Sequence, residues 1–447
     1  MKRMLIMVLA LSMVAVLALP ALAEVQNIKV TGSIVVRGFY RDSYGTTGSG
    51  TERDFQAGNF TSAYGERDWY NTQTQLGVSA DLTDNVAANI LIANERDWNV
   101  SGAGNSTTIA LQCSYITLKE MLYSPLTVKI GKMPISIADR LIIGDGSTGT
   151  ASNLMGSDYD DDKAFDAIIG TLDYEPLTLG LGIIKYEEGA SLTSNDDADV
   201  YFINSIYSFE DDMNTVLDIS LFNVRWSKPD SGHTGLDASD TAPITGSTNA
   251  VNFNTLAAVL TAEPMESLFA KLGIALQQGD YMIDPTANVS RDLDAMAMDL
   301  DVNYAIDAEY SPKVGLKYVY RSGQDPSKTT GDYEQWQAMF EDQCNGIIYD
   351  PNSNISAIAL TASAVPADRL TVSAAYWLYT LDEAVAASGT RTNDDEAGQE
   401  LDLAGRYAYT EDVSMGLELA WFFPGNSYAS GSDKTASQVM LELGVKF

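Results

Sequence analysis

Strict alternation of apolar and polar residues is the feature that most constrains this chain. In the last eleven residues, SQVMLELGVKF (437–447), every second position is apolar: Val439, Leu441, Leu443, Val445 and Phe447. A period of two is the period of a β-strand whose two faces meet different surroundings. Similar stretches recur from residue 27 to the end without a linker or a change of composition. The pattern predicts a single all-β domain.

The segments between these stretches are of two kinds that alternate along the chain. Short turns rich in Pro, Asp and Asn occur at 82–85, 123–126, 174–177, 209–213, 263–266, 310–313, 365–369 and 410–412. Long loops rich in Gly, Ser, Asn and Asp occur near 43–68, 99–108, 133–163, 188–197, 228–250, 281–292, 324–352, 382–397 and 424–436. Eight short and nine long connections predict about 18 strands.

This arrangement predicts a transmembrane antiparallel β-barrel with short periplasmic turns and long extracellular loops. An even strand number, with short turns on one side and long loops on the other, is typical of the bacterial outer membrane. Lipid offers no hydrogen bonds to backbone amides, so a spanning sheet must close on itself. A secreted sandwich or propeller also alternates, but its loops do not sort into one short and one long set.

The first residues have the pattern of a secretory signal peptide. An apolar run follows Lys2 and Arg3 and ends at Pro20 and an Ala-Leu-Ala motif. Pro20 argues against an uncleaved anchor because it would break a spanning helix. We expect removal of residues 1–23, which leaves residues 24–447 as one outer-membrane barrel domain.

Charge and cysteine content exclude several functions. The chain has 27 Lys and Arg against 61 Asp and Glu, a net charge of −34, which disfavours nucleic acid as a partner. Cys113 and Cys344 are far apart and form no CxxC motif, so they predict no metal site. The acidic loop with Asp158, Asp160 and Asp162 could hold Ca²⁺, although it lacks the glycine and distal glutamate of a calcium hand. The alternative is a solvated loop, and no other cofactor is expected.

The sequence lacks the combinations of nucleophile, base and metal ligands that known catalytic motifs contain. Its one histidine, His233, lies in a loop of turn-forming residues without a nucleophile elbow, phosphate loop or zinc spacing around it. We therefore expect the protein not to be an enzyme.

Alternation also assigns residues to the inside of the barrel. Around Ile34 and Tyr40, which face outward, Arg37 and Arg41 fall on the inner face. The same reasoning places further basic residues inside, namely Lys29, Lys313, Lys317, Arg321 and Arg406, together with the acidic Glu400, Asp402 and Glu418. A barrel of this strand number leaves an aqueous channel, and charges inside it select solutes. The alternative is that these side chains only brace the wall through salt bridges.

Two further segments carry specific expectations. Trp336, Met339 and Phe340 have helical spacing within 332–346, which predicts a loop helix packed at the barrel mouth. The terminal Phe447 resembles the signal by which outer-membrane assembly machinery recognises its clients. We expect its ring at the inner-leaflet interface, with lipid and lipopolysaccharide around the barrel.

Three stretches together resemble the alginate-export porins, a family of 18-stranded outer-membrane barrels. They are LTVKIGKMPISIADRLIIGD (126–145) with AFDAIIGTLDY (164–174), YRSGQDP (320–326) with YEQWQAMF (333–340), and AGQELDLAGRYAYTEDVSMGLELAWFFPG (397–425). The chain departs from the family at Lys132 and Met133, where the family often has Arg and Gln, and in its acidic composition.

The resemblance implies an outer-membrane channel that passes hydrophilic solutes or an anionic polysaccharide. Its basic path would comprise Arg37, Arg41, Lys132, Arg140, Lys317, Arg321 and Arg406. Lys132 and Arg140 come from the motif and the others from the face assignment. The alternative function is a structural or adhesive surface barrel with a plugged lumen.

Overall fold

In the computed structural model of the protein, nine ranges are described: residues 26–43, 66–98, 109–122, 125–144, 164–187, 198–226, 251–284, 289–340 and 345–447. The expected signal peptide, residues 1–23, lies outside them. In these ranges no helix is long and apolar enough to cross a membrane.

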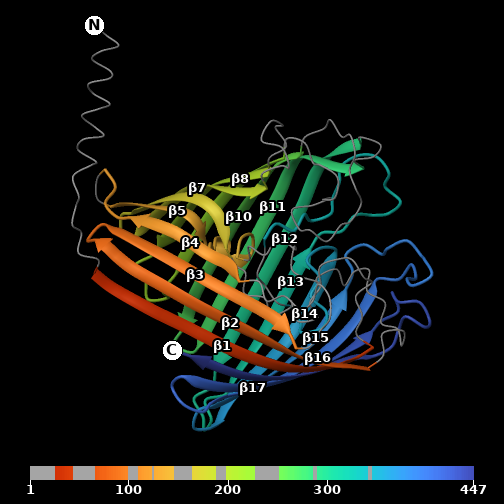
Figure 1. The fold of residues 1–447 in the computed structure, drawn as a ribbon. Coiled ribbons are helices and arrows are strands. Elements are labelled where there is room, and N and C mark those ends of the chain that lie inside the picture. Colours follow the sequence, from red (N-terminus) through yellow and green to blue (C-terminus); the bar gives the residue numbers. More distant parts are fainter. Residues whose placement is uncertain are drawn as a thin grey trace.

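The described residues form 18 strands and one short 3₁₀ turn (Figure 1). The elements are β1 (Gln26–Asp42), β2 (Glu66–Thr83), β3 (Val86–Asp97), β4 (Ala110–Leu118), β5 (Leu126–Met133), η1 (Ala138–Arg140), β6 (Phe165–Asp173), β7 (Leu177–Glu187), β8 (Ala198–Ser208), β9 (Val216–Trp226), β10 (Val251–Met265), β11 (Leu268–Asp284), β12 (Val289–Ala305), β13 (Lys313–Arg321), β14 (Ile355–Ala367), β15 (Leu370–Thr380), β16 (Glu396–Ala408), β17 (Val413–Pro424) and β18 (Ala436–Lys446).

The strands form one closed antiparallel sheet, which confirms the predicted barrel. Each strand pairs with its neighbours in sequence, and β1 pairs with both β2 and β18 (Figure 1). The closing register runs from Ser33 opposite Lys446 to Asp42 opposite Ser437. The predicted short turns and long loops all separate the expected strands. One loop is much shorter than the predicted 281–292, because β11 continues to Asp284 and β12 starts at Val289.

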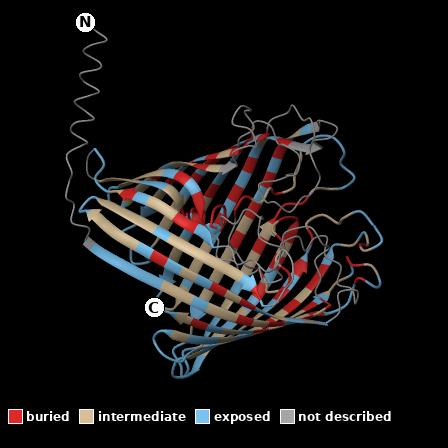
Figure 2. Cartoon of the chain, in the orientation of Figure 1, coloured by how far each residue is buried: buried red, intermediate tan, exposed pale blue. Residues whose placement is uncertain are grey.

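The outer face of the barrel carries an apolar belt. Ile34, Leu316 and Leu441 belong to it and are 43%, 41% and 58% exposed. Figure 2 shows buried and exposed residues alternating along the strands, as the period of two requires. Such a large exposed apolar surface suits contact with hydrocarbon rather than water.

Inward-facing side chains are buried mainly at the end of the barrel that carries the long loops. On β10 the inward residues Phe253, Thr255 and Ala257 are fully buried, whereas the short-turn end from Glu263 to Met265 is exposed. On β14, likewise, the buried residues lie near the long-loop end (Figure 2). Chain segments from the long loops therefore enter that half of the barrel.

Candidate functional site: the barrel lumen

The loop after β5 folds into the barrel. Leu141, Ile142 and Ile143 are at most 1% exposed and pack in an apolar cluster with inward residues of β8 to β12. The contact with the wall is close, because a Cβ atom on Gly273 of β11 would lie 3.0 Å from Leu141 Cδ2. Residues 134–144 therefore narrow the lumen from the side of β8 to β12.

This loop contains a left-handed turn. Ala138, Asp139 and Arg140 have φ angles of +54°, +49° and +65°, a region that non-glycine residues adopt at a cost. An ion pair of 2.7 Å between Asp139 Oδ2 and Lys271 Nζ on β11 fixes the turn to the wall. Strained backbone of this kind persists where surrounding contacts hold it, and such positions are often functional.

The loop between β13 and β14 also enters the lumen. Tyr333 forms a parallel bridge with Leu293 of β12, and Trp336 and Met339 are 1% and 2% exposed. The predicted loop helix is wrong for residues 332–340, which are not helical. Apolar residues three and four apart serve here to anchor a non-helical segment to the wall, because packing decides where periodicity is ambiguous. Residues 341–344 lie outside the described ranges.

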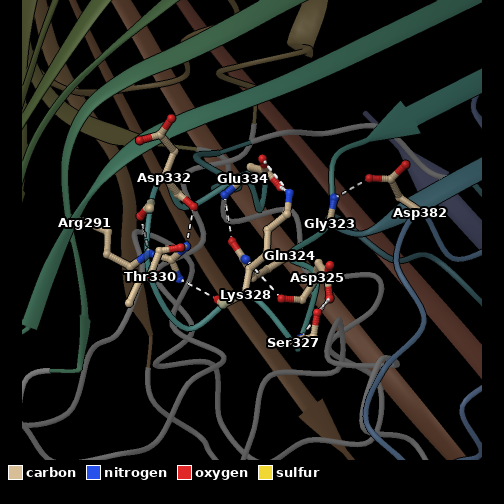
Figure 3. Close-up of polar contacts among 11 residues, drawn as sticks. Arg291, Gly323, Gln324, Asp325, Ser327, Lys328, Thr330, Asp332, Glu334 and Asp382 are labelled. Carbon is tan, nitrogen blue, oxygen red and sulfur yellow. Dashed lines mark hydrogen bonds and ion pairs between the residues drawn. The ribbon is translucent and has the colours of Figure 1, made fainter.

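One arginine holds the outer part of this loop (Figure 3). The guanidinium of Arg291 on β12 donates to the carbonyl oxygens of Lys328 (3.2 Å), Thr330 (3.3 Å), Gly331 (2.7 Å) and Asp332. A planar group with five donors can serve several carbonyl oxygens at once. Arg291 therefore shapes this loop through its backbone.

Side chains of the loop stabilise the same turn. Asp325 Oδ1 accepts hydrogen bonds from the hydroxyl (2.7 Å) and the backbone N–H (2.8 Å) of Ser327 (Figure 3). These bonds favour the ionised carboxylate and lower the pKa of Asp325. The 2.7 Å ion pair with Glu334 raises the pKa of Lys328. The loop is thus held by specific bonds on both sides of its reversal.

The two loops meet inside the barrel. Ile143 and Phe340 form a parallel bridge, with hydrogen bonds from Phe340 N–H to Ile142 O (3.0 Å) and from Gly144 N–H to Phe340 O (2.7 Å). The Phe340 ring packs edge-on against Phe165 of β6 at 5.2 Å. We call residues 134–144 and 333–340 together the lumen strap. Its two ends leave the wall after β5 and after β13, far apart in the ring of strands.

A third segment, residues 345–350, docks on the opposite part of the wall. The buried carboxylate of Glu400 on β16 accepts hydrogen bonds from the backbone N–H groups of Ile347 (2.7 Å), Ile348 (2.7 Å) and Tyr349 (2.8 Å). The Tyr349 ring stacks on Phe422 of β17 at 4.7 Å. This docking creates the second apolar cluster of the lumen.

A cavity of 330 Å³ lies between this segment and the wall of β12 to β16. Its polar lining comprises Asn303, Lys313, Lys317, Thr361, Ser363, Ser373 and Asp402. Neither lysine forms an ion pair with any residue that the structure describes. Two ammonium groups outnumber the one carboxylate of this lining and lie beside three hydroxyls, so the cavity suits an anionic, hydrogen-bonding solute.

The wall of β1 to β4 carries a network of polar side chains. Gln75 accepts a hydrogen bond from Ser33 (3.2 Å) and donates to Gln112 (3.0 Å). Asn71 donates to Glu95 (3.0 Å) and to Asp97 (3.2 Å). Bonded amides and carboxylates of this kind suit a wall that faces water.

Four predicted path residues lie inside the barrel and contact the wall. Arg37 Nε lies 3.0 Å from Glu442, and Arg406 contacts Glu418 at 3.0 Å and Glu442 at 3.5 Å. The other two are Arg41, whose Nε donates to Gln438 at 2.5 Å, and Arg321, which forms a bidentate pair with Asp299 at 2.6 and 3.1 Å. Their contacts match the bracing alternative, whereas Lys317 faces the cavity.

The two residues taken from the motif lie in different places. Arg140 belongs to the turn of the lumen strap and is exposed there. Lys132 instead shares the outer face with Ile130, which is 41% exposed, and lies opposite Asp166 of β6 in the strand register. Its neighbour Met133 points inward and is 1% exposed. Strand alternation thus corrects the lumen placement of Lys132.

Sequence reasoning missed Lys129, and it placed Lys313 and Glu400 on the inner face without giving either a role in the site. Lys129 of β5 lies on the inner face, two positions before Gly131, and is exposed there. Continuing the alternation inward from Met133 would have found it, whereas the motif drew attention to Lys132. The docking role of Glu400 had no signal in the sequence, because it depends on a loop about 50 residues away in the chain.

Some predicted sites lie outside the described ranges. Asp158, Asp160 and Asp162 are among them, so the calcium site stays a prediction, as does any role for His233. Within the part of the chain that is described, no group of three or more His, Cys, Asp or Glu side chains is placed to hold a metal ion.

Known structures share this architecture. The fold resembles Pseudomonas aeruginosa OccK2 (OpdF) at 12% identity and a TM-score of 0.57, over 94% of this chain and 98% of that one. It also resembles the outer membrane protein OprD of Pseudomonas aeruginosa at 11% identity and a TM-score of 0.57, over 95% and 96% of the two chains. The chain therefore has the fold of the outer-membrane porins.

A comparison of the sequence with protein families gives a more specific similarity. Residues 245–442, from β10 to β18, match the model of the alginate export family, which confirms the resemblance drawn from the motifs. The comparison with curated proteins found no match.

Proposed function

We propose that the protein is a channel through which hydrophilic solutes cross the outer membrane, with a preference for anions at the cavity beside Lys313 and Lys317. It carries out no enzymatic step. The carrying observation is that both ammonium groups line a lumen cavity without an ion partner in the described residues. The fold and the family match support transport.

A similar barrel crystallised with an organic solute adds support for a small anionic ligand. OpdK of Pseudomonas aeruginosa was solved with vanillate, and it resembles this chain at 12% identity and a TM-score of 0.56, over 94% of this chain and 98% of that one. An anionic polysaccharide such as alginate, whose export gives the matching family its name, would use the same two lysines. The proposal covers both as ligands carrying carboxylate groups.

Ion selectivity in planar bilayers tests this proposal. The recordings use a salt gradient near 0.1 M, where charges are screened over about 10 Å. Replacing both lysines by glutamate (Lys313→Glu with Lys317→Glu) is expected to shift the reversal potential toward cation selectivity. Lys132→Glu is the matched control, because it makes the same kind of charge change on the outer face. Equal shifts in the two variants, or no shift in either, would contradict the proposal.

A second candidate is a surface barrel with a closed lumen. It is favoured by the two apolar clusters that fill the long-loop half of the barrel. The same recordings separate the two functions. A steady current in the parent protein supports the channel, whereas no current in the parent and current only after deletion of residues 333–340 supports a plug.

A further inference from the structure

The loop segment that Glu400 binds, residues 345–350, is tightly packed. Tyr379 Oη donates to the Asn345 carbonyl oxygen, and Asn345 N–H donates to Asp350 Oδ1 at 2.8 Å, which closes a compact turn. A Cβ atom on Gly346 would lie 2.4 Å from Tyr379 Oη and 3.0 Å from Glu400 Oε2. The segment is therefore built around the carboxylate and the tyrosine rather than lying loosely over them.

The Glu400 carboxylate is the polar centre of this docking. Both of its oxygens are used, and the three donors are consecutive backbone N–H groups, a pattern that binds anions strongly. The side chain is fully buried, so water does not compete for these bonds. Replacing the carboxylate would leave three backbone donors, two of them buried, without their acceptor.

The docked segment also forms part of the cavity. Ile347, the first residue held by Glu400, lines the cavity opposite the wall that carries Lys313 and Lys317. Glu400 itself does not line it. The position of Ile347, and with it the space available to a solute, thus depends on bonds made outside the cavity.

We propose that Glu400 is a positioning residue, which sets the width of the lumen cavity by holding the Ile347–Tyr349 backbone against the wall. Loss of the carboxylate releases this segment and opens the cavity. The inference deepens the channel function proposed above and rests on it for its consequence in transport. Its structural part can be measured without any current.

Thiol labelling at position 347 tests the proposal. The full-length barrel carries Ile347→Cys with Cys113→Ala and Cys344→Ala, and its reaction with a charged, water-soluble maleimide is timed. Glu400→Leu is expected to speed labelling by about tenfold or more, because all three hydrogen bonds lose their acceptor. Glu400→Gln is expected to be intermediate, since its amide oxygen still accepts while its NH₂ group opposes one N–H.

The control removes a different lumen carboxylate. Glu418→Gln breaks a contact with Arg406 and is expected to leave labelling at position 347 unchanged. Slower migration after heating on a gel identifies the folded barrel in each variant, and if Glu400→Leu does not fold, Glu400→Gln decides. Labelling at the parent rate in both Glu400 variants would overturn the proposal. Faster labelling in a barrel that carries no current would retain it and reject the channel function.

Discussion

Charged residues inside this barrel divide into those that brace the wall and those that face open space. Arg321 and Asp299 are buried and bound to each other, whereas Lys317, four residues before Arg321 on the same face, faces the cavity. Alternation predicts the inner face for both, because it depends only on strand geometry. It does not predict partners, since these come from neighbouring strands. A charge reversal at Arg321 would therefore bring two carboxylates together before it changed selectivity.

The buried pair gives a prediction at this scale. Arg321→Met leaves Asp299 buried and unpaired, and we expect it to lower the free energy of unfolding by about 3–5 kcal/mol. Adding Asp299→Leu is expected to recover most of this loss, because no buried charge remains. Urea unfolding in lipid vesicles measures both. Additive losses in the double variant would show that the pair is not what stabilises this part of the wall.

The elements show how far sequence patterns reach. The strands were predictable because each has one face toward lipid and one toward the lumen, so every strand repeats the same signal. The conformation of residues 333–340 was not predictable, because the spacing of Trp336 and Phe340 fits a helix as well as an extended chain. The conformation adopted depends on Arg291 and on the wall of β12, which lie far from the loop in sequence. The conformation of a lumen loop can therefore be known only from the tertiary structure.

Arg291 gives a prediction for this loop. We expect Arg291→Lys to loosen residues 328–332, because one ammonium group cannot serve four carbonyl oxygens in these positions. Limited trypsin digestion is expected to cleave after Lys328 several times faster than in the parent. Arg225→Lys on the outer face is the matched control. Equal cleavage in parent and Arg291→Lys would show that the guanidinium does not hold the loop.

The same loop has a predicted pH dependence. Hydrogen bonds from Ser327 lower the pKa of Asp325 below its ordinary value of 3.8. A lowered pKa means that the stabilisation of the loop is present above 3.8 and is lost as the pH falls through the lower, folded-state value. The Ser327 amide resonance in ¹⁵N-serine NMR spectra is expected to titrate with a midpoint below 3.8. A midpoint at or above that ordinary value, or the same titration in Asp325→Asn, would contradict this account.

At the scale of the whole molecule, closure of the sheet depends on the pairing of its first and last strands. Gly32 and Phe447 exchange two backbone hydrogen bonds, from Gly32 N–H to Phe447 O (2.8 Å) and from Phe447 N–H to Gly32 O (2.9 Å). The Phe447 ring covers Gly32 so closely that a Cβ there would lie 2.4 Å from Cζ. The ring is 66% exposed on the outer face, as the alternation predicted.

Deletion of Phe447 separates closure from recognition. If the two hydrogen bonds between Gly32 and Phe447 matter for closure of the sheet, the shortened chain is expected to fold less completely into vesicles of pure lipid. The measurement is the fraction of protein whose migration on a gel changes on heating, which is expected to be smaller. If the residue serves recognition by the assembly machinery, as expected from the sequence, the folded fraction is expected to fall further in cells than in vesicles. Equal folded fractions for the parent and the shortened chain in both settings would exclude both roles.

The lumen strap joins two stretches of sequence nearly 200 positions apart through Ile143 and Phe340. Neither loop can be lengthened, shortened or repacked on its own without disturbing the other, since each provides the surface on which its partner lies. Over evolutionary time such loops are expected to change together. A homologue that altered its permeability through one of them would carry a compensating change in the second.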